Sequence, residues 1–225
     1  RDLHSFPTRR SVDLTLLDPV QLAHEIREKQ VTFLWVVAPR WNQLVQARPD
    51  LFAGVKRIMI GGDALSPYHI NLAREHSPGL AFINGYGPTE NTSFSTYHFL
   101  SEADSEIIPI GRPITNSTAY IVNPDGHLLP AGVKGELYVG GPGVARGYYQ
   151  RPELTQEKFV PNPFFADEDL LYRTGDLVSW RDNGLIDFYG RIDFQIKIRG
   201  FRVELGEIET VILNTAPVSQ ALVLR

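Results

Sequence analysis

Cysteine is absent from this chain of 225 residues, and methionine occurs once. The lack of cysteine excludes disulfide bonds, thiolate metal sites and a cysteine nucleophile, and it fits a protein of a reducing cytoplasm. An excess of basic charge is also lacking, because the net charge is −4 and the lysines and arginines are dispersed, so we expect no nucleic-acid partner. No apolar run is long enough to cross a bilayer, so we expect no membrane partner either.

The first 14 residues, RDLHSFPTRRSVDL, need a separate explanation. Apart from Val12, they resemble the in-frame translation of a sequencing-library adapter. They have neither the apolar stretch nor the small-residue cleavage site of a signal peptide. We therefore expect residues 1–14 to be a translation artefact, and the natural open reading frame to be longer than this chain.

Helices and strands are expected to alternate from Asp18 to Gly85. Asp18 is suited to cap a helix that starts at Pro19, and Ser66 is suited to cap a later helix. The apolar run 31–37 is short and rich in β-branched and aromatic residues, which predicts a buried strand. The first helix is expected to place four apolar side chains on one face: Val20, Leu22, Ala23 and Ile26.

Two more strands are expected at residues 57–60 and 80–84, with helices at 39–46 and 66–74. Strands that alternate with helices indicate an α/β fold with a mostly parallel sheet. Ligands of such sheets bind beyond the carboxyl ends of the strands. Gly61, Gly62 and Gly85 fall at these ends.

Short strands separated by turns are expected after Pro109, which predicts an antiparallel, barrel-like layer. The predicted strands are residues 119–122, 135–139, 177–180 and 186–189. The last part of the chain predicts a hairpin around Gly200, a helix at 205–213 and a strand at 221–224.

Four glycine-rich blocks follow one another at residues 84–90, 135–148, 172–176 and 190–209. In the first, Gly87 permits close approach of a ligand, Thr89 offers a hydroxyl to a phosphate, and Glu90 offers an oxygen ligand suited to Mg²⁺. In the later blocks, Asp176 has two acceptor oxygens that suit a vicinal diol, and Arg191 has a donor fork that suits oxyanions. Each feature alone has a plainer explanation as a turn residue or a surface ion pair.

In this order, the blocks resemble the adenylation domains of nonribosomal peptide synthetases, which belong to the adenylate-forming superfamily. The resemblance implies a truncated adenylate-forming fold. Residues 15–193 are then the C-terminal half of the large subdomain, and residues 194–225 begin a small α+β subdomain. The implied reaction uses ATP and Mg²⁺ to activate an amino acid as an aminoacyl-adenylate. The implied partners are a peptidyl carrier domain with its phosphopantetheine and a condensation domain.

The resemblance also implies roles for individual residues. Tyr86 packs on adenine, Thr89 contacts the α-phosphate, Glu90 helps to hold the metal, and Asp176 binds the ribose hydroxyls. Thr89 and Glu90 are the candidate catalytic residues. Other implied nucleotide contacts are Gly61, Gly62, Gly87 and Arg191. Asp193 matches a hinge between the subdomains, and Gly200 is expected to swing toward the pantetheine arm.

An amino-acid pocket is also implied by local alignment to the family. Its residues are Trp35, Met59, Gly61, Gly85, Ser93 and Phe94. Two glycines leave room while apolar side chains form the walls, a pattern that resembles pockets selecting valine, with isoleucine or a similar small branched residue as alternatives. The plainer explanation is that Trp35 and Met59 belong to the core.

Two parts required by the family's chemistry do not occur in these residues. One is a Ser/Thr/Gly-rich phosphate loop, and the other is the lysine of the small subdomain, so we expect the chain alone to be inactive. Two rival functions remain at this stage. One is an acyl-CoA or aryl acid CoA ligase, and the other is a non-catalytic adenine-nucleotide-binding domain.

Overall fold

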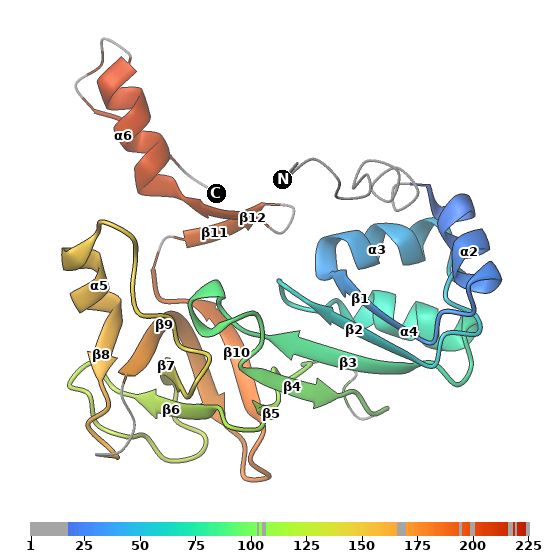
Figure 1. Ribbon diagram of the computed structural model, residues 1–225, viewed down its shortest axis with the longest axis horizontal. Coiled ribbons are helices and arrows are strands. Elements are labelled where there is room, and N and C mark those ends of the chain that lie inside the picture. Colours follow the sequence, from blue (N-terminus) through green and yellow to red (C-terminus); the bar gives the residue numbers. More distant parts are fainter. Residues whose placement is uncertain are drawn as a thin grey trace, which may run out of the picture.

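A computed structural model describes residues 18–102, 104, 107–165, 170–193, 195–198, 201–215, 218 and 220–223. Residues 1–14 and Gly200, for which the sequence carries predictions, lie outside the described residues. Figure 1 shows an α/β sheet with its helices, an antiparallel layer beside it, and a hairpin above the junction of the two, from which helix α6 extends above the antiparallel layer.

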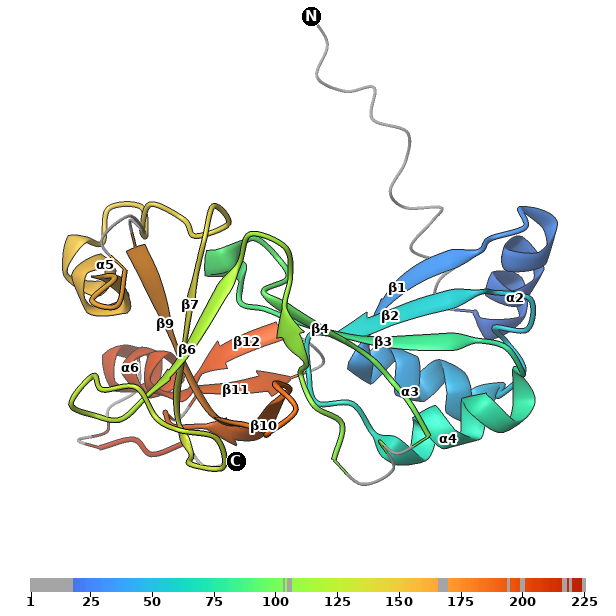
Figure 2. The same cartoon turned by 90° about the horizontal axis from the view of Figure 1, so that it is seen from below.

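The first sheet contains β1 (Phe33–Val37), β2 (Arg57–Gly61), β3 (Ala81–Tyr86), β4 (Thr96–Phe99) and β5 (Arg112–Pro113), in that order. Its first three strands are parallel, as predicted, and β4 and β5 continue it in antiparallel fashion. Helices α2 (Pro19–Glu28), α3 (Ala38–Ala47) and α4 (Pro67–His76) share one core with one face of β2 and β3. Figure 2 shows α3 and α4 on that single face.

Helix α2 begins as predicted, because the Asp18 carboxylate accepts the Val20 amide hydrogen at 2.8 Å. Two details of the helix predictions are wrong. Val20 is 65% exposed, so the buried face consists of Leu22, Ala23 and Ile26 alone. Ser66 stands at the start of α4 without capping it. Its hydroxyl lies 2.8 Å from His69 Nδ1 instead.

Strand β1 is half-exposed, which corrects the prediction of a buried strand. Leu34 and Val36 pack against the core, whereas Phe33 and Trp35 on the opposite face are 52% and 50% exposed. The reason is that successive side chains of a strand point to opposite faces, and the helices cover only one of them.

The second sheet is antiparallel, with strand order β10-β9-β7-β6 and β8 paired to β9. Its elements are β6 (Thr118–Val122), β7 (Gly135–Gly140), β8 (Phe159–Pro161), β9 (Leu170–Trp180) and β10 (Ile186–Arg191). A short helix, α5 (Pro152–Lys158), precedes β8. Strand β9 is longer than the predicted strand 177–180, because the glycine-containing block 172–176 is also part of it.

The C-terminal part contains the predicted hairpin, formed by β11 (Gln195–Ile198) and β12 (Phe201–Glu204), and helix α6 (Leu205–Thr215). The prediction of a strand at 221–224 is wrong for the described residues 221–223. The Val223 amide donates to the Glu209 carboxylate at 2.9 Å rather than to a neighbouring strand. Among the residues that the structure describes, every helix is too short or too polar to cross a membrane.

Candidate nucleotide site

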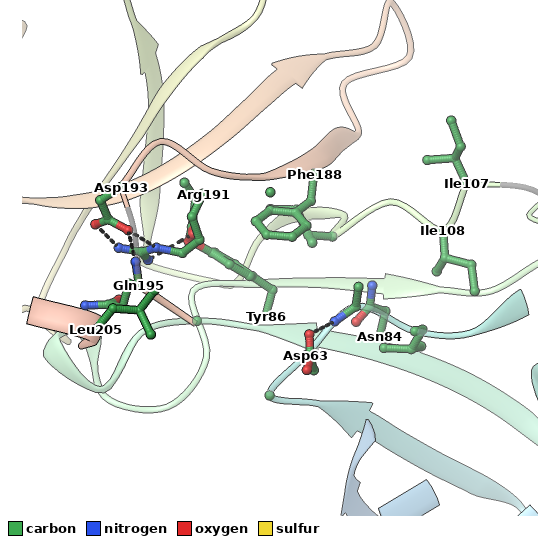
Figure 3. Close-up of a pocket in the computed structure, with 18 of the residues that line it drawn as sticks. Asp63, Asn84, Tyr86, Ile107, Ile108, Phe188, Arg191, Asp193, Gln195 and Leu205 are labelled. Carbon is green, nitrogen blue, oxygen red and sulfur yellow. Dashed lines mark hydrogen bonds and ion pairs between the residues drawn. The ribbon is translucent and has the colours of Figure 1, made fainter. Parts of the chain in front are cut away.

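A cavity of about 630 Å³ lies where the two sheets and the C-terminal hairpin meet (Figure 3). This volume is in the range of pockets that bind small molecules. The cavity brings together predicted residues from four separate segments: Gly62, Gly85, Tyr86, Gly87, Asp176, Arg191 and Asp193.

Asp176 is the centre of the polar contacts in this cavity. Its side chain is 8% exposed, and Arg191 Nη1 donates to its Oδ1 at 3.0 Å. The Tyr86 hydroxyl donates to the second oxygen, Oδ2. An ionised carboxylate can accept about four hydrogen bonds, and its two oxygens suit a vicinal diol.

A bulge in β9 presents Asp176 to the cavity. The pairing with β7 shifts so that Glu136 faces Leu177 while Tyr138 faces Arg173. Gly175 has φ +72° within this bulge, a conformation that glycine adopts without strain. Bulges often redirect a side chain next to a functional site. Here the bulge interrupts β9 only locally, and regular strand continues on both sides of it.

Arg191 bridges two carboxylates, and Figure 3 shows its contacts with one of them, Asp193. Besides Asp176, it contacts Asp193 through Nε at 2.7 Å and Nη2 at 2.5 Å. Burial alone raises the pKa of Asp193, but the hydrogen bonds and charge of Arg191 outweigh it and hold this pKa below its ordinary value. Burial and then the neighbouring Asp176 charge raise the pKa of Tyr86 well above its ordinary value, so Tyr86 acts as a neutral donor.

Three glycines near the site lie close to neighbouring atoms, which are backbone atoms for Gly61 and Gly87 and side-chain atoms for Gly85. A Cβ atom on Gly61 would lie 2.1 Å from the Gly85 carbonyl oxygen, and one on Gly87 would lie 2.6 Å from the Ser93 oxygen. A Cβ on Gly85 would lie 2.8 Å from the Phe94 ring. Gly61 is therefore a residue of close strand packing, whereas Gly85 and Gly87 reach the cavity.

Thr89 and Glu90 lie in the 3₁₀ turn η1 (Thr89–Asn91), next to the cavity but not among its lining residues. The Tyr148 hydroxyl donates to Glu90 Oε1 at 2.6 Å, and the Ala145 amide donates to the Glu90 carbonyl at 2.8 Å. The described residues contain no group of three or more His, Cys, Asp or Glu able to hold a metal. Glu90 therefore fits a Mg²⁺ site in which a single carboxylate and the phosphates of the substrate together coordinate the ion.

The predicted amino-acid pocket forms a second cluster, on the open face of the first sheet. Trp35 and Met59 are register partners on β1 and β2. The Trp35 and Phe94 rings meet edge to face at 6.2 Å. A Cβ on Gly85 would touch both Phe94 and Met59. Trp35 is half-exposed, so the alternative that it is a core residue is wrong. Ser93 is an exposed residue with φ +70°.

Known proteins share the sequence and the fold of this chain. A sequence profile of the family described as AMP-binding enzyme matches residues 10–149. The chain belongs to the AMP-binding enzyme family. Within this family it groups with the adenylation domains of nonribosomal peptide synthetases, as its relatives show.

Tyrocidine synthase 3 of Brevibacillus parabrevis is 53% identical over 92% of this chain. Gramicidin S synthase 2 of Brevibacillus brevis is 48% identical over 97% of it. The chain spans only 3% and 5% of these synthetases. The solved structure of holo-PA1221, an NRPS protein containing adenylation and PCP domains bound to a vinylsulfonamide inhibitor, matches with a TM-score of 0.87 and 33% identity. That match covers 92% of this chain and 37% of the other.

Several residues that line the cavity were not predicted from sequence. Phe188 lies beside Tyr86, with the ring centroids 6.4 Å apart, and Ile107 and Ile108 form another wall. Phe188 could have been found, because it precedes Gly190 and Arg191 on the same strand. The isoleucines stand in a segment without periodicity or motif, so the sequence carries no signal for them.

Proposed function

We propose that this chain forms the nucleotide-binding side of an enzyme that activates an amino acid as its aminoacyl-adenylate. The observation that carries the proposal is the convergence of Tyr86, Asp176 and Arg191 on one cavity from segments far apart in sequence. In this reaction the amino-acid carboxylate attacks the α-phosphate of ATP, and pyrophosphate leaves.

Asp176 is the proposed acceptor for the ribose hydroxyls, held in place by Tyr86 and Arg191. Arg191 also supplies positive charge beside the bound phosphates. Thr89 is proposed to donate to the α-phosphate, and Glu90 to hold Mg²⁺ together with phosphate oxygens. When bound there, the ion would neutralise charge on the phosphates. Tyr148 fixes the orientation of the Glu90 carboxylate.

The acceptor of the activated amino acid is proposed to be the phosphopantetheine thiol of a peptidyl carrier domain, with a condensation domain as a further partner. The supporting fact is that the solved structural relative contains adenylation and PCP domains. Asp193 is the proposed hinge, because it lies between β10 and the hairpin and its Oδ1 accepts the Gln195 amide at 3.1 Å.

The proposed substrate is valine or a similarly small branched amino acid. The cluster of Trp35, Met59 and Phe94 supports it, because these apolar side chains pack against one another and around Gly85. An apolar pocket discriminates by only about 1–3 kcal/mol per methylene, so valine should exceed leucine by a modest factor and charged amino acids should be rejected.

The first test is ATP binding by this 225-residue chain, measured by calorimetry. Asp176→Ala should weaken binding about 10- to 100-fold, because it removes a charged hydrogen-bond acceptor. Asp125→Ala, in an exposed turn, is the control and should bind like the wild type. Absence of ATP binding by the wild-type chain, or equal binding by Asp176→Ala, would refute the nucleotide site.

The second test is ATP–pyrophosphate exchange by a complete adenylation domain containing this chain, assayed with a panel of amino acids. Exchange should depend on an added amino acid, with valine preferred. Turnover with fatty or aryl acids and coenzyme A would identify a CoA ligase instead, and ATP binding without exchange would identify a non-catalytic nucleotide-binding domain. The 225 residues alone should show no exchange.

A further inference from the structure

The carboxylate of Glu136 on β7 holds the bulge of β9 that presents Asp176. Its Oε1 accepts the Gly175 amide hydrogen at 3.2 Å, and its Oε2 accepts Arg173 Nη2 at 3.1 Å. The Glu136 side chain is 16% exposed and Gly175 is buried, so the contact with the Gly175 amide is largely shielded from water, whereas the Arg173 side chain is 38% exposed. The Glu136 side chain therefore contacts both Arg173 and Gly175, which lie three residues and one residue before Asp176.

The bulge needs such contacts because its amides lack regular ladder partners. Between the pairs Glu136–Leu177 and Tyr138–Arg173, one residue of β7 faces residues 174–176 of β9. The Asp176 amide donates to Thr174 Oγ1 at 3.0 Å, and that hydroxyl donates to the Leu137 carbonyl at 2.7 Å. The Gly175 amide depends on Glu136. Leaving a buried amide unsatisfied is costly, so removal of Glu136 should rearrange the bulge.

The glycine makes this dependence stronger. Gly175 occupies φ +72°, but a glycine adopts many other conformations about as readily. The local sequence therefore does not fix the bulge by itself. The bulge geometry is set by the contacts that its neighbours make with it: Glu136 of β7 accepts the Gly175 amide, and the Ile192 amide beside β10 donates to the Gly175 carbonyl at 2.8 Å.

We propose that Glu136 is a positioning residue that sets the place of the Asp176 carboxylate and, through it, the recognition of the nucleotide's ribose. The inference rests on the proposed function, in which Asp176 receives the ribose hydroxyls. Displacement of a binding group by about 1 Å is enough to lose most of an oriented interaction. A loss of Glu136 should therefore abolish ribose recognition even though Asp176 is still present.

The test compares the binding of ATP and 2′,3′-dideoxy-ATP to the 225-residue chain by calorimetry. If Asp176 binds the ribose diol, the wild type should prefer ATP about 10- to 100-fold. Glu136→Ala should reduce this preference to about threefold or less. Glu136→Gln should keep most of it, because the amide oxygen can still accept the Gly175 hydrogen. Glu136→Asp keeps the charge but is one methylene shorter, so it should lose the preference.

Val45→Ala is the control for a general loss of stability. Val45 is fully buried in the other core, away from the bulge, so this variant should be less stable yet keep the full preference for ATP. The ratio of the two dissociation constants is the deciding quantity, since a merely structural defect lowers the folded fraction for both ligands equally.

The outcomes separate this inference from the proposed function. If Asp176→Ala leaves the preference intact, the ribose role of Asp176 is wrong. If Asp176→Ala abolishes the preference while Glu136→Ala retains it, the positioning role of Glu136 is overturned. If Glu136→Ala does not unfold cooperatively on heating, Glu136→Asp decides in its place, and a wild-type preference in that variant overturns the inference.

Discussion

Replacement of Arg191 by methionine should destabilise the protein strongly, because it leaves two carboxylates without their shared cation. The Asp176 side chain is 8% exposed and Arg191 is 20% exposed, so this is a buried ion pair. Breaking such a pair by removing one partner costs about 3–5 kcal/mol. The Asp193 side chain is 36% exposed, and solvent screening limits its pair to about 1 kcal/mol or less. Because Tyr86 still donates to Asp176, we expect a total of about 3–4 kcal/mol at pH 7.

The loss should also depend on pH. Arg191 holds the pKa of Asp193 below its ordinary value, against the effect of burial. A lowered folded-state pKa contributes stability above the unfolded-state pKa of about 3.9, and this contribution disappears as the pH falls through the lower folded value. The difference between wild type and Arg191→Met should therefore shrink as the pH falls from about 4 toward the lowered folded-state pKa of Asp193.

The assay is urea unfolding of the wild type, Arg191→Met and Arg191→Lys across this pH range. Lysine keeps the charge but not the planar fork, so Arg191→Lys should lose an intermediate amount of stability. A loss below about 1 kcal/mol for Arg191→Met at pH 7 would place the network among surface ion pairs and refute the reasoning. A loss that is equal at pH 7 and pH 3 would refute the assigned role of Asp193.

Three further predictions concern the frame around the site. Gly61→Ala should cost more than about 3 kcal/mol in unfolding free energy, because the new Cβ would lie 2.1 Å from the Gly85 carbonyl oxygen. Gly126→Ala is the control: it is strained only by φ +82° and should cost about 1 kcal/mol. Similar losses for both variants would contradict the close strand approach. Asp104→Asn should cost about 1–3 kcal/mol at neutral pH, because the carboxylate lies 2.9 Å from His98 Nε2 and accepts from Ser101. Burial raises the pKa of Asp104, but the contacts with Ser101 and His98 outweigh burial and hold this pKa below its ordinary value. The stability lost in Asp104→Asn should therefore diminish in acid. Urea midpoints of wild type and variant that differ equally at pH 7 and pH 3 would count against this prediction. Trp35→Ala should cost about 1–2 kcal/mol, because Trp35 is half-exposed, yet it should change the order of amino acids in pyrophosphate exchange. The buried Trp41→Ala should cost about 3–5 kcal/mol. An unchanged order of amino acids in Trp35→Ala would remove Trp35 from the pocket.

Much of the fold followed from local patterns in the sequence. The start of α2 at Asp18 and Pro19, the parallel strands β1 to β3 and the hairpin from Gln195 were predicted because capping, periodicity and turn chemistry act over a few residues. The failures have a common cause. Val20 and Trp35 are exposed, and Ser66 contacts His69, because burial and hydrogen-bond partners are decided by what packs nearby.

The sequence by itself determined which chemical groups are available and in what order along the chain: the phenol of Tyr86, the carboxylate of Asp176 and the guanidinium of Arg191. Only the tertiary structure decided that they touch. Tyr86 and Asp176 are 90 residues apart, and they meet because two different sheets bring β3 and β9 to one cavity. The role of Glu136 likewise depends on the register of β7 against β9. Such contacts depend on the packing of distant strands, and no local sequence pattern encodes them.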